Sequence, residues 1–175
     1  MERFAGRHVL VTGAGTGIGR AIALRLAAEG ARVTLTARGR ERLEATAAEI
    51  GAGAFVAPAD IRDRTQVDGA FAAAAAAQGP LHALGACAGM GGPNEAGPGD
   101  RFDDLVATNL SGTYLCARAA ERHLDGGPDL RHVVVIASIL ARIGVFGYTG
   151  YCATKAALLG LVRPPPPSSR PETSR

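Results

Sequence analysis

The sequence predicts an α/β fold built on a doubly wound parallel sheet. Short apolar or β-branched segments alternate with longer segments rich in Ala, Leu, Arg and Glu along the 175 residues. The chain has 24 Gly and no Trp, which is typical of helices packed closely on a sheet with tight turns. With 47% hydrophobic and 20% charged residues, it is long enough to bury one sizeable core. We therefore expect a single domain.

Five segments have the length and the β-branched or apolar content of buried strands: His8–Val11, Arg32–Thr36, Ala54–Ala57, Leu81–Cys87 and His132–Ala137. Five longer segments favour helix, and the third of them carries an Ala run: Gly17–Glu29, Arg40–Ile50, Thr65–Gln78, Arg101–Leu124 and Gly150–Val162. Strict alternation of strand and helix implies parallel strands joined by right-handed crossovers. The result is a Rossmann-like sheet with helices on both faces.

This regular pattern ends at about Val162. Arg163 leads into the prolines 164–167 and then a Ser-rich segment, which can neither continue a helix nor pair in a sheet. We expect an incomplete Rossmann-like domain over residues 1–162 and a disordered Pro/Ser-rich tail over residues 163–175. A flexible tail is one interpretation, and a frameshift that truncates a longer protein is the other.

Charge and cysteine usage exclude several classes of function. The formal charge of +3 comes from scattered arginines without a basic run, so we expect no nucleic-acid partner. Cys87, Cys116 and Cys152 lack CxxC or Cys/His spacing, so neither a disulfide framework nor a metal site is expected. No signal-peptide pattern is present, and no apolar segment reaches the ~18 residues of a membrane span. We expect a cytoplasmic protein with no membrane association.

A glycine-rich turn, TGAGTGIG, follows the first strand and leads directly into the first helix. Glycines let backbone N–H groups approach a phosphate, and the helix N-terminus adds partial positive charge. The position after a first strand is that of a dinucleotide pyrophosphate site. We expect the following residues to bind it: Thr12, Gly13, Gly17, Ile18 and Gly19. A purely structural turn is the alternative.

The end of the second strand indicates which nicotinamide cofactor is bound. An acidic residue there would hold a ribose 2′-hydroxyl, but the chain has Ala37 followed by Arg38. A guanidinium binds phosphate through a charge-assisted fork, so Arg38 favours NADP over NAD. The alternative is a solvated surface arginine next to Arg40 and Arg42.

Four polar residues after the fourth strand form a candidate catalytic set. Tyr151 and Lys155 are four residues apart and share one helical face, Ser138 follows the fifth strand, and Asn109 lies in TNLSG. Lys155 is the only lysine beside 18 arginines, which indicates that a compact ammonium is required there. A nearby ammonium favours the charged form of a phenol, as proton exchange near neutral pH requires.

These motifs resemble the short-chain dehydrogenase/reductase family, whose TGxxxGxG turn, serine and YxxxK occur here in order over residues 7–162. The resemblance implies that Tyr151 is the acid–base group and that Lys155 also holds the nicotinamide ribose. It further implies that Ser138 binds the substrate oxygen and that Asn109 supports a proton-relaying water. The remaining residues of the implied cofactor site are Asp60, Ile61, Ala88 and Gly89.

The chain also departs from this family. The fourth strand ends in Ala86-Cys87-Ala88-Gly89 where the family usually has NNAG, and Thr16 stands where NADP-using members often carry a basic residue. Relatives continue with further strands, a Pro-Gly turn and a substrate lid. With these C-terminal strands missing, we expect the fifth strand to be an exposed edge and activity to be weakened.

The resemblance therefore implies an NADP-dependent oxidoreductase that moves hydride between nicotinamide and a ketone or secondary alcohol, with a 3-oxoacyl thioester as one candidate substrate. The alternative is a truncated, non-catalytic remnant that binds nucleotide or a partner subunit. The resemblance also implies a homodimer or homotetramer packed through the helices at 101–124 and 150–162.

Overall fold

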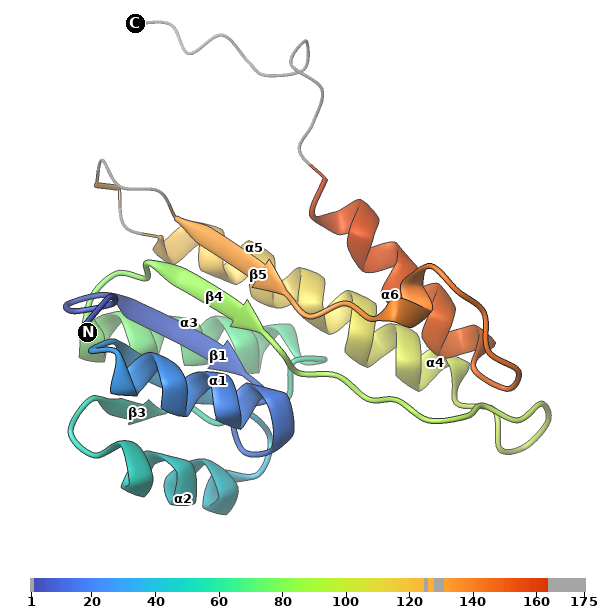
Figure 1. Cartoon of the computed structure of the whole chain (residues 1–175), viewed down its shortest axis with the longest axis horizontal. Helices are drawn as coiled ribbons and strands as arrows, with labels where there is room; N and C mark the ends of the chain where they lie inside the picture. The colour runs from blue at the N-terminus through green and yellow to red at the C-terminus, as the bar shows by residue number, and fades with distance from the viewer. Residues whose placement is uncertain (1, 125, 128–130, 164–175) are drawn as a thin grey trace, which may run out of the picture.

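A parallel sheet with the strand order β3-β2-β1-β4-β5 forms the centre of the computed structural model (Figure 1). The structure describes residues 2–124, 126–127 and 131–163. The strands are β1 His8–Thr12, β2 Arg32–Thr36, β3 Ala54–Val56, β4 Ala83–Ala86 and β5 His132–Val135. The strand order reverses at β1, because β2 and β3 lie on one side of it and β4 and β5 on the other. The prediction of a Rossmann-like doubly wound sheet is confirmed.

Helices cover both faces of this sheet. Helices α1 Gly17–Ala28 and α2 Arg40–Ile50 cover one face, and α3 Arg64–Gln78 and α5 Thr113–His123 cover the other. Helices α4 Phe102–Leu105 and α6 Thr149–Leu161 pack on each other. A π-helical segment, Val106–Gly112, joins α4 to α5, and a 3₁₀ turn, Ile139–Ala141, precedes α6. The expected helix and strand positions agree with these bounds to within one or two residues at most ends.

Alternate residues of β1 explain why helices pack on both faces. Val9 and Val11 belong to the apolar cluster with α1 and α2, whereas Leu10 belongs to the cluster with α3 and α5. All five residues of β1 are buried, as expected of a central parallel strand. The central strand of the sheet is therefore held between two helical layers, and its carboxyl end remains open for a binding site.

Three predicted elements differ from the structure. The fourth strand begins at Ala83, and Leu81 instead forms an isolated bridge with Leu124. The fifth strand ends at Val135, although the N–H of Ile136 still donates to the carbonyl of Ala86. The helix expected over 101–124 is interrupted by the π-helical segment, because one wide turn leaves no trace in apolar periodicity. Such π turns are frequent at functional sites.

β5 lies at one edge of the sheet and, among the described strands, pairs only with β4. Its residue Val134 is 54% exposed. The predicted tail lies outside the described residues, except for Arg163. Within the described part of the chain, no helix has the length and apolar character that crossing a membrane requires.

Candidate active site

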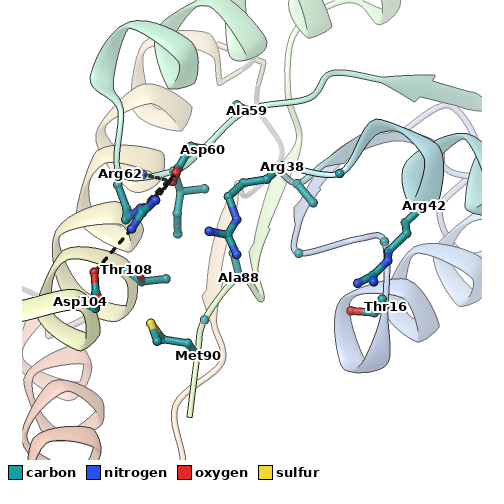
Figure 2. A pocket seen from close by; sticks show the side chains of 16 residues that line it. Thr16, Arg38, Arg42, Ala59, Asp60, Arg62, Ala88, Met90, Asp104 and Thr108 are labelled. Atoms are coloured by element: carbon teal, nitrogen blue, oxygen red, sulfur yellow. Dashed lines mark hydrogen bonds and ion pairs between the residues drawn. The ribbon is translucent and has the colours of Figure 1, made fainter. Parts of the chain in front are cut away.

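A pocket of about 390 Å³ opens at the carboxyl ends of the strands, where the strand order reverses (Figure 2). Parallel α/β sheets bind ligands at this position. Loops after β1, β2, β3 and β4 form its wall, together with Asp104 and Thr108 from the α4 and π-helical segments. Six predicted cofactor residues line it: Gly13, Arg38, Asp60, Ile61, Ala88 and Gly89.

The glycine-rich turn is folded so tightly that side chains cannot replace two of its glycines. Gly13 has φ +68°, and a Cβ added to it would lie 2.9 Å from the Cα of Ala88. A Cβ added to Gly19 would lie 2.4 Å from the carbonyl oxygen of Gly13. Helix α1 therefore starts directly against the turn, and Thr16, at its N-terminus, makes no side-chain cap. The first N–H groups of α1 are left for an anion.

Thr12 ties this turn to the end of β4. Its hydroxyl oxygen accepts hydrogen bonds from the backbone N–H groups of Cys87 and Ala88, both at 3.1 Å. Thr12 does not line the pocket, and neither do three other predicted residues of the turn, Gly17, Ile18 and Gly19. These residues shape the turn, and their contact with a cofactor stays a prediction.

The charged residues at one end of the pocket are paired, one arginine with two carboxylates. The guanidinium of Arg62 donates to Oδ1 of Asp60 at 3.1 Å and to its Oδ2 at 2.7 Å, and lies 3.6 Å from the carboxylate of Asp104. Hydrogen bonding to Arg62 lowers the pKa of Asp60, so its carboxylate is ionised at neutral pH. Figure 2 shows this bridge and the Arg38 side chain reaching over the pocket from the loop after β2.

The segment 88–91 connects the pocket to the predicted catalytic pair. A Cβ added to Gly89 would lie 3.6 Å from the Nζ of Lys155, and one added to Gly91 would lie 3.4 Å from the Cε2 of Tyr151. Because Ala88, Gly89 and Met90 also line the pocket, one short segment faces the cofactor site and touches both catalytic candidates.

Lys155 is a nearly buried ammonium beside the phenol ring. Its side chain belongs to a residue only 7% exposed, and its Nζ donates to the carbonyl oxygen of Ile136 at 2.7 Å. The same Nζ lies 5.8 Å from the ring centroid of Tyr151. Burial lowers the pKa of Lys155. The structure thus places the single lysine of the chain beside the ring of Tyr151.

Asn109 holds the segment 88–91 against α6. It is fully buried on the π-helical segment, its Oδ1 accepts from the N–H of Met90 at 2.8 Å, and its Nδ2 donates to the carbonyl of Met90 at 2.9 Å. The Nδ2 also donates to the Oγ1 of Thr154 at 3.2 Å. Its side chain is therefore occupied in positioning the site, and the predicted support of a relay water stays a prediction.

Ser138 follows the end of β5 and begins the 3₁₀ turn. Its Oγ accepts a hydrogen bond from the N–H of Leu140 at 3.1 Å. Among the described residues its own O–H has no acceptor, so this hydroxyl can donate to a ligand. The 3₁₀ turn packs on α6, the helix that carries Tyr151.

Sequence reasoning missed several residues of the pocket wall. They are Arg42, Arg62, Met90, Asp104 and Thr108. Only Thr108 belongs to a motif, TNLSG, and the others share no signal except their position near the carboxyl ends of strands or at the start of the helix that follows. In the sequence Arg42 is one of three neighbouring arginines, whereas the structure places it in the pocket wall, on the first turn of α2.

The fold, the glycine turn and the pocket at the switch point are the features of an α/β protein of the Rossmann-like class. A family model described as short chain dehydrogenase matches residues 7–164. The chain belongs to this family.

Several curated proteins and solved structures are similar to this chain. The 3-oxoacyl-[acyl-carrier-protein] reductase MabA of Mycobacterium tuberculosis is 33% identical over 91% of this chain and 62% of its own length. Levodione reductase of Leifsonia aquatica is 35% identical over 92% of this chain and 63% of its own length. A dehydrogenase/reductase structure from Sinorhizobium meliloti is 38% identical with a TM-score of 0.82, over 90% of this chain and 64% of that one. The chain thus spans about three-fifths of these relatives.

Proposed function

We propose that this chain acts as an NADP-dependent oxidoreductase on a ketone or secondary alcohol. The observation that carries the proposal is the segment 88–91, which forms part of the pocket wall and packs against both Tyr151 and Lys155. A cofactor in the pocket would therefore reach the predicted acid–base pair. When bound, the nicotinamide supplies or accepts the hydride.

The residues of the pocket fit a dinucleotide with a 2′-phosphate. A Cβ at Gly13 or Gly19 would collide with backbone, so the turn is kept open to phosphate by residues without side chains. The turn and the start of α1 would hold the pyrophosphate, together with Gly17 and Ile18. Arg38 would hold the 2′-phosphate, and Asp60 and Ile61 would flank the adenine. NAD is the less favoured cofactor, because no acidic residue ends β2.

The catalytic residues supply the proton. Tyr151 donates it to the carbonyl oxygen during reduction and accepts it from the alcohol during oxidation. The ammonium of Lys155, 5.8 Å from the ring centroid of Tyr151, would hold the nicotinamide ribose beside the phenol. The free O–H of Ser138 hydrogen-bonds the substrate oxygen, and Asn109 keeps the segment 88–91 in place.

An apolar substrate suits the segment between Ser138 and Tyr151. Four of its apolar side chains are exposed: Ile139, Ile143, Val145 and Phe146. A reductase of 3-oxoacyl chains is among the similar proteins. A 3-oxoacyl thioester is therefore the first substrate to test.

Assembly and location are proposed as well. We infer a homodimer or homotetramer packed through residues 101–124 and 150–162, where Phe102, Tyr114 and Val162 are exposed. Size-exclusion chromatography with light scattering tests this, and a stable monomer would contradict it. Cys87, Cys116 and Cys152 are free thiols, which supports a reducing cytoplasm.

The function is tested with the full chain, by following NADPH oxidation in absorbance with a panel of ketones and 3-oxoacyl thioesters. Turnover with NADPH and slower turnover with NADH is the expected result. Calorimetric binding of NADPH without turnover of any carbonyl would favour the alternative, a nucleotide-binding remnant. Absence of both binding and turnover would refute the cofactor site itself.

A further inference from the structure

Two arginines in the pocket wall have no carboxylate within ion-pair distance among the described residues, although the charge of Arg38 contributes to the lowered pKa of Asp60. Arg40, on the first turn of α2, pairs with Glu44 at 3.5 Å, and Arg20 of α1 pairs with Glu49 of α2. Arg38 and Arg42 line the pocket, and neither forms an ion pair with a residue that the structure describes. Two unpaired guanidinium groups in one pocket wall indicate an anionic ligand.

The backbone of Arg42 is fixed relative to the glycine-rich turn. A Cβ added to Gly15 would lie 3.1 Å from the Cβ of Arg42, so α2 packs closely on the turn at this point. The buried hydroxyl of Thr46, one helical turn further on, donates to the carbonyl oxygens of Ala14 at 3.3 Å and of Arg42 at 3.0 Å. Arg42 is therefore anchored beside the turn, although its own side chain is exposed.

The direction of the Arg42 side chain agrees with this anchoring. Figure 2 shows it extending from α2 toward Thr16, while Arg38 extends from the loop after β2. Thr16 itself carries no charge and makes no cap bond. At the other end of the pocket, Asp60 and Asp104 both bind Arg62. The unpaired positive charge of the pocket is therefore contributed by Arg38 and Arg42.

We propose that Arg42 is a second phosphate-binding residue, which holds the ribose 2′-phosphate of NADP together with Arg38. This rests on the proposed function, because it assumes that NADP occupies the pocket. A phosphate monoester carries about −1.5 to −2 charges at about pH 7 and three acceptor oxygens, which one guanidinium does not neutralise. Two guanidinium groups match both the charge and the number of acceptors.

The test is calorimetric binding of two small nucleotides to the full chain, adenosine 2′,5′-bisphosphate and 5′-AMP, which differ in the 2′-phosphate alone. The variants are Arg42→Gln, Arg38→Gln and, as the matched control, Arg40→Gln, whose side chain already has Glu44 as its partner. We expect Arg42→Gln to weaken the binding of the bisphosphate by about tenfold and the binding of 5′-AMP by less than about twofold. Arg40→Gln should change neither affinity by more than about twofold.

A double variant adds a second readout. Thr16→Arg combined with Arg42→Gln returns a guanidinium to the same corner of the pocket, and we expect it to restore much of the bisphosphate affinity. Thermal unfolding of each variant shows whether the fold is kept, which the exposure of Arg42 leads us to expect.

The outcomes separate this inference from the function on which it rests. Equal affinity of the wild-type chain for both nucleotides would refute the proposed NADP preference itself. A wild-type preference that Arg38→Gln removes and Arg42→Gln leaves intact would overturn the role of Arg42 alone, and would make it a solvated surface arginine. An equal loss of affinity for both nucleotides in Arg42→Gln would also overturn the proposed role of Arg42, because the 2′-phosphate would then not be the group that it recognises.

Discussion

Because Gly19 packs closely against the glycine-rich turn, we predict that alanine at this position and alanine at Gly69 change the stability of the protein in opposite directions. Gly19 lies in α1, and a Cβ added there would stand 2.4 Å from the carbonyl oxygen of Gly13 and 2.7 Å from its carbon. Gly69 lies in the interior of α3, and an added Cβ would meet nothing within 4 Å. We expect Gly69→Ala to stabilise the protein and Gly19→Ala to destabilise it.

The magnitudes follow from two competing effects. Alanine exceeds glycine in helix propensity by about 1 kcal/mol, and at Gly69 this gain is unopposed. At Gly19 the carbon–oxygen contact falls about 0.9 Å short of the ~3.3 Å at which such atoms normally meet. Relieving it by moving backbone costs about 1–3 kcal/mol or more. For a domain of this size 1 kcal/mol corresponds to about 2–4 °C, so the midpoints should move in opposite directions by a few degrees.

Thermal and urea unfolding followed by circular dichroism measure both variants against the wild type. Calorimetry with NADPH adds a second readout, because a displaced turn should lose the cofactor while Gly69→Ala retains it. A Gly19→Ala protein as stable as Gly69→Ala, with unchanged cofactor affinity, would refute the packing of α1 on the turn.

Two further predictions concern ionisation. Arg3 and Arg25 lower the pKa of Glu29 from 4.5 to about 2. The stability that the ionised carboxylate contributes is therefore complete above about pH 4.5 and is lost as the pH falls through about 2. The difference in urea midpoint between wild type and Glu29→Gln should therefore shrink on acidification, and a difference independent of pH would contradict the pairing. Burial lowers the pKa of Lys155 from 10.5, so the folded state binds fewer protons than the unfolded state between the folded value and 10.5. As the pH rises toward 10.5, the free energy of unfolding of the wild type should therefore increase relative to that of Lys155→Met. A difference between the two proteins that does not change with pH would exclude a buried ammonium.

The alternation of strands and helices was sufficient to predict the fold. The β1 segment reads as a strand because it is a short, largely apolar and β-branched run, and the structure buries all of its residues. The glycine-rich turn after it was expected to bind a pyrophosphate, and it lies where the strand order reverses. The π-helical segment around Asn109 was not predictable, because a single widened turn depends on tertiary packing. Ile61 presses on Gly112 there, where an added Cβ would lie 2.7 Å from the Ile61 side chain.

The candidate site was predictable where residue type and spacing are demanding. The lone lysine at Lys155 and the phenol one turn before it identified the pair that the structure brings together. The partners of Asn109 were not predictable, since Met90 and Thr154 meet it only in the folded chain. Arg62, which binds Asp60 in the pocket, also left no sequence signal, because arginine is the ordinary basic residue of this chain.

The central claim is that Tyr151 performs the proton transfer beside the cofactor pocket. Tyr148 offers a matched control, since its ring lies 6.4 Å from that of Tyr151 at an angle of 80° and has no assigned role. The decisive measurement is kcat for NADPH-dependent carbonyl reduction together with the Kd of NADPH, in Tyr151→Phe and Tyr148→Phe. We predict that Tyr151→Phe lowers kcat by at least about 100-fold with Kd changed less than about twofold, and that Tyr148→Phe retains both. Retention of kcat in Tyr151→Phe would contradict the account.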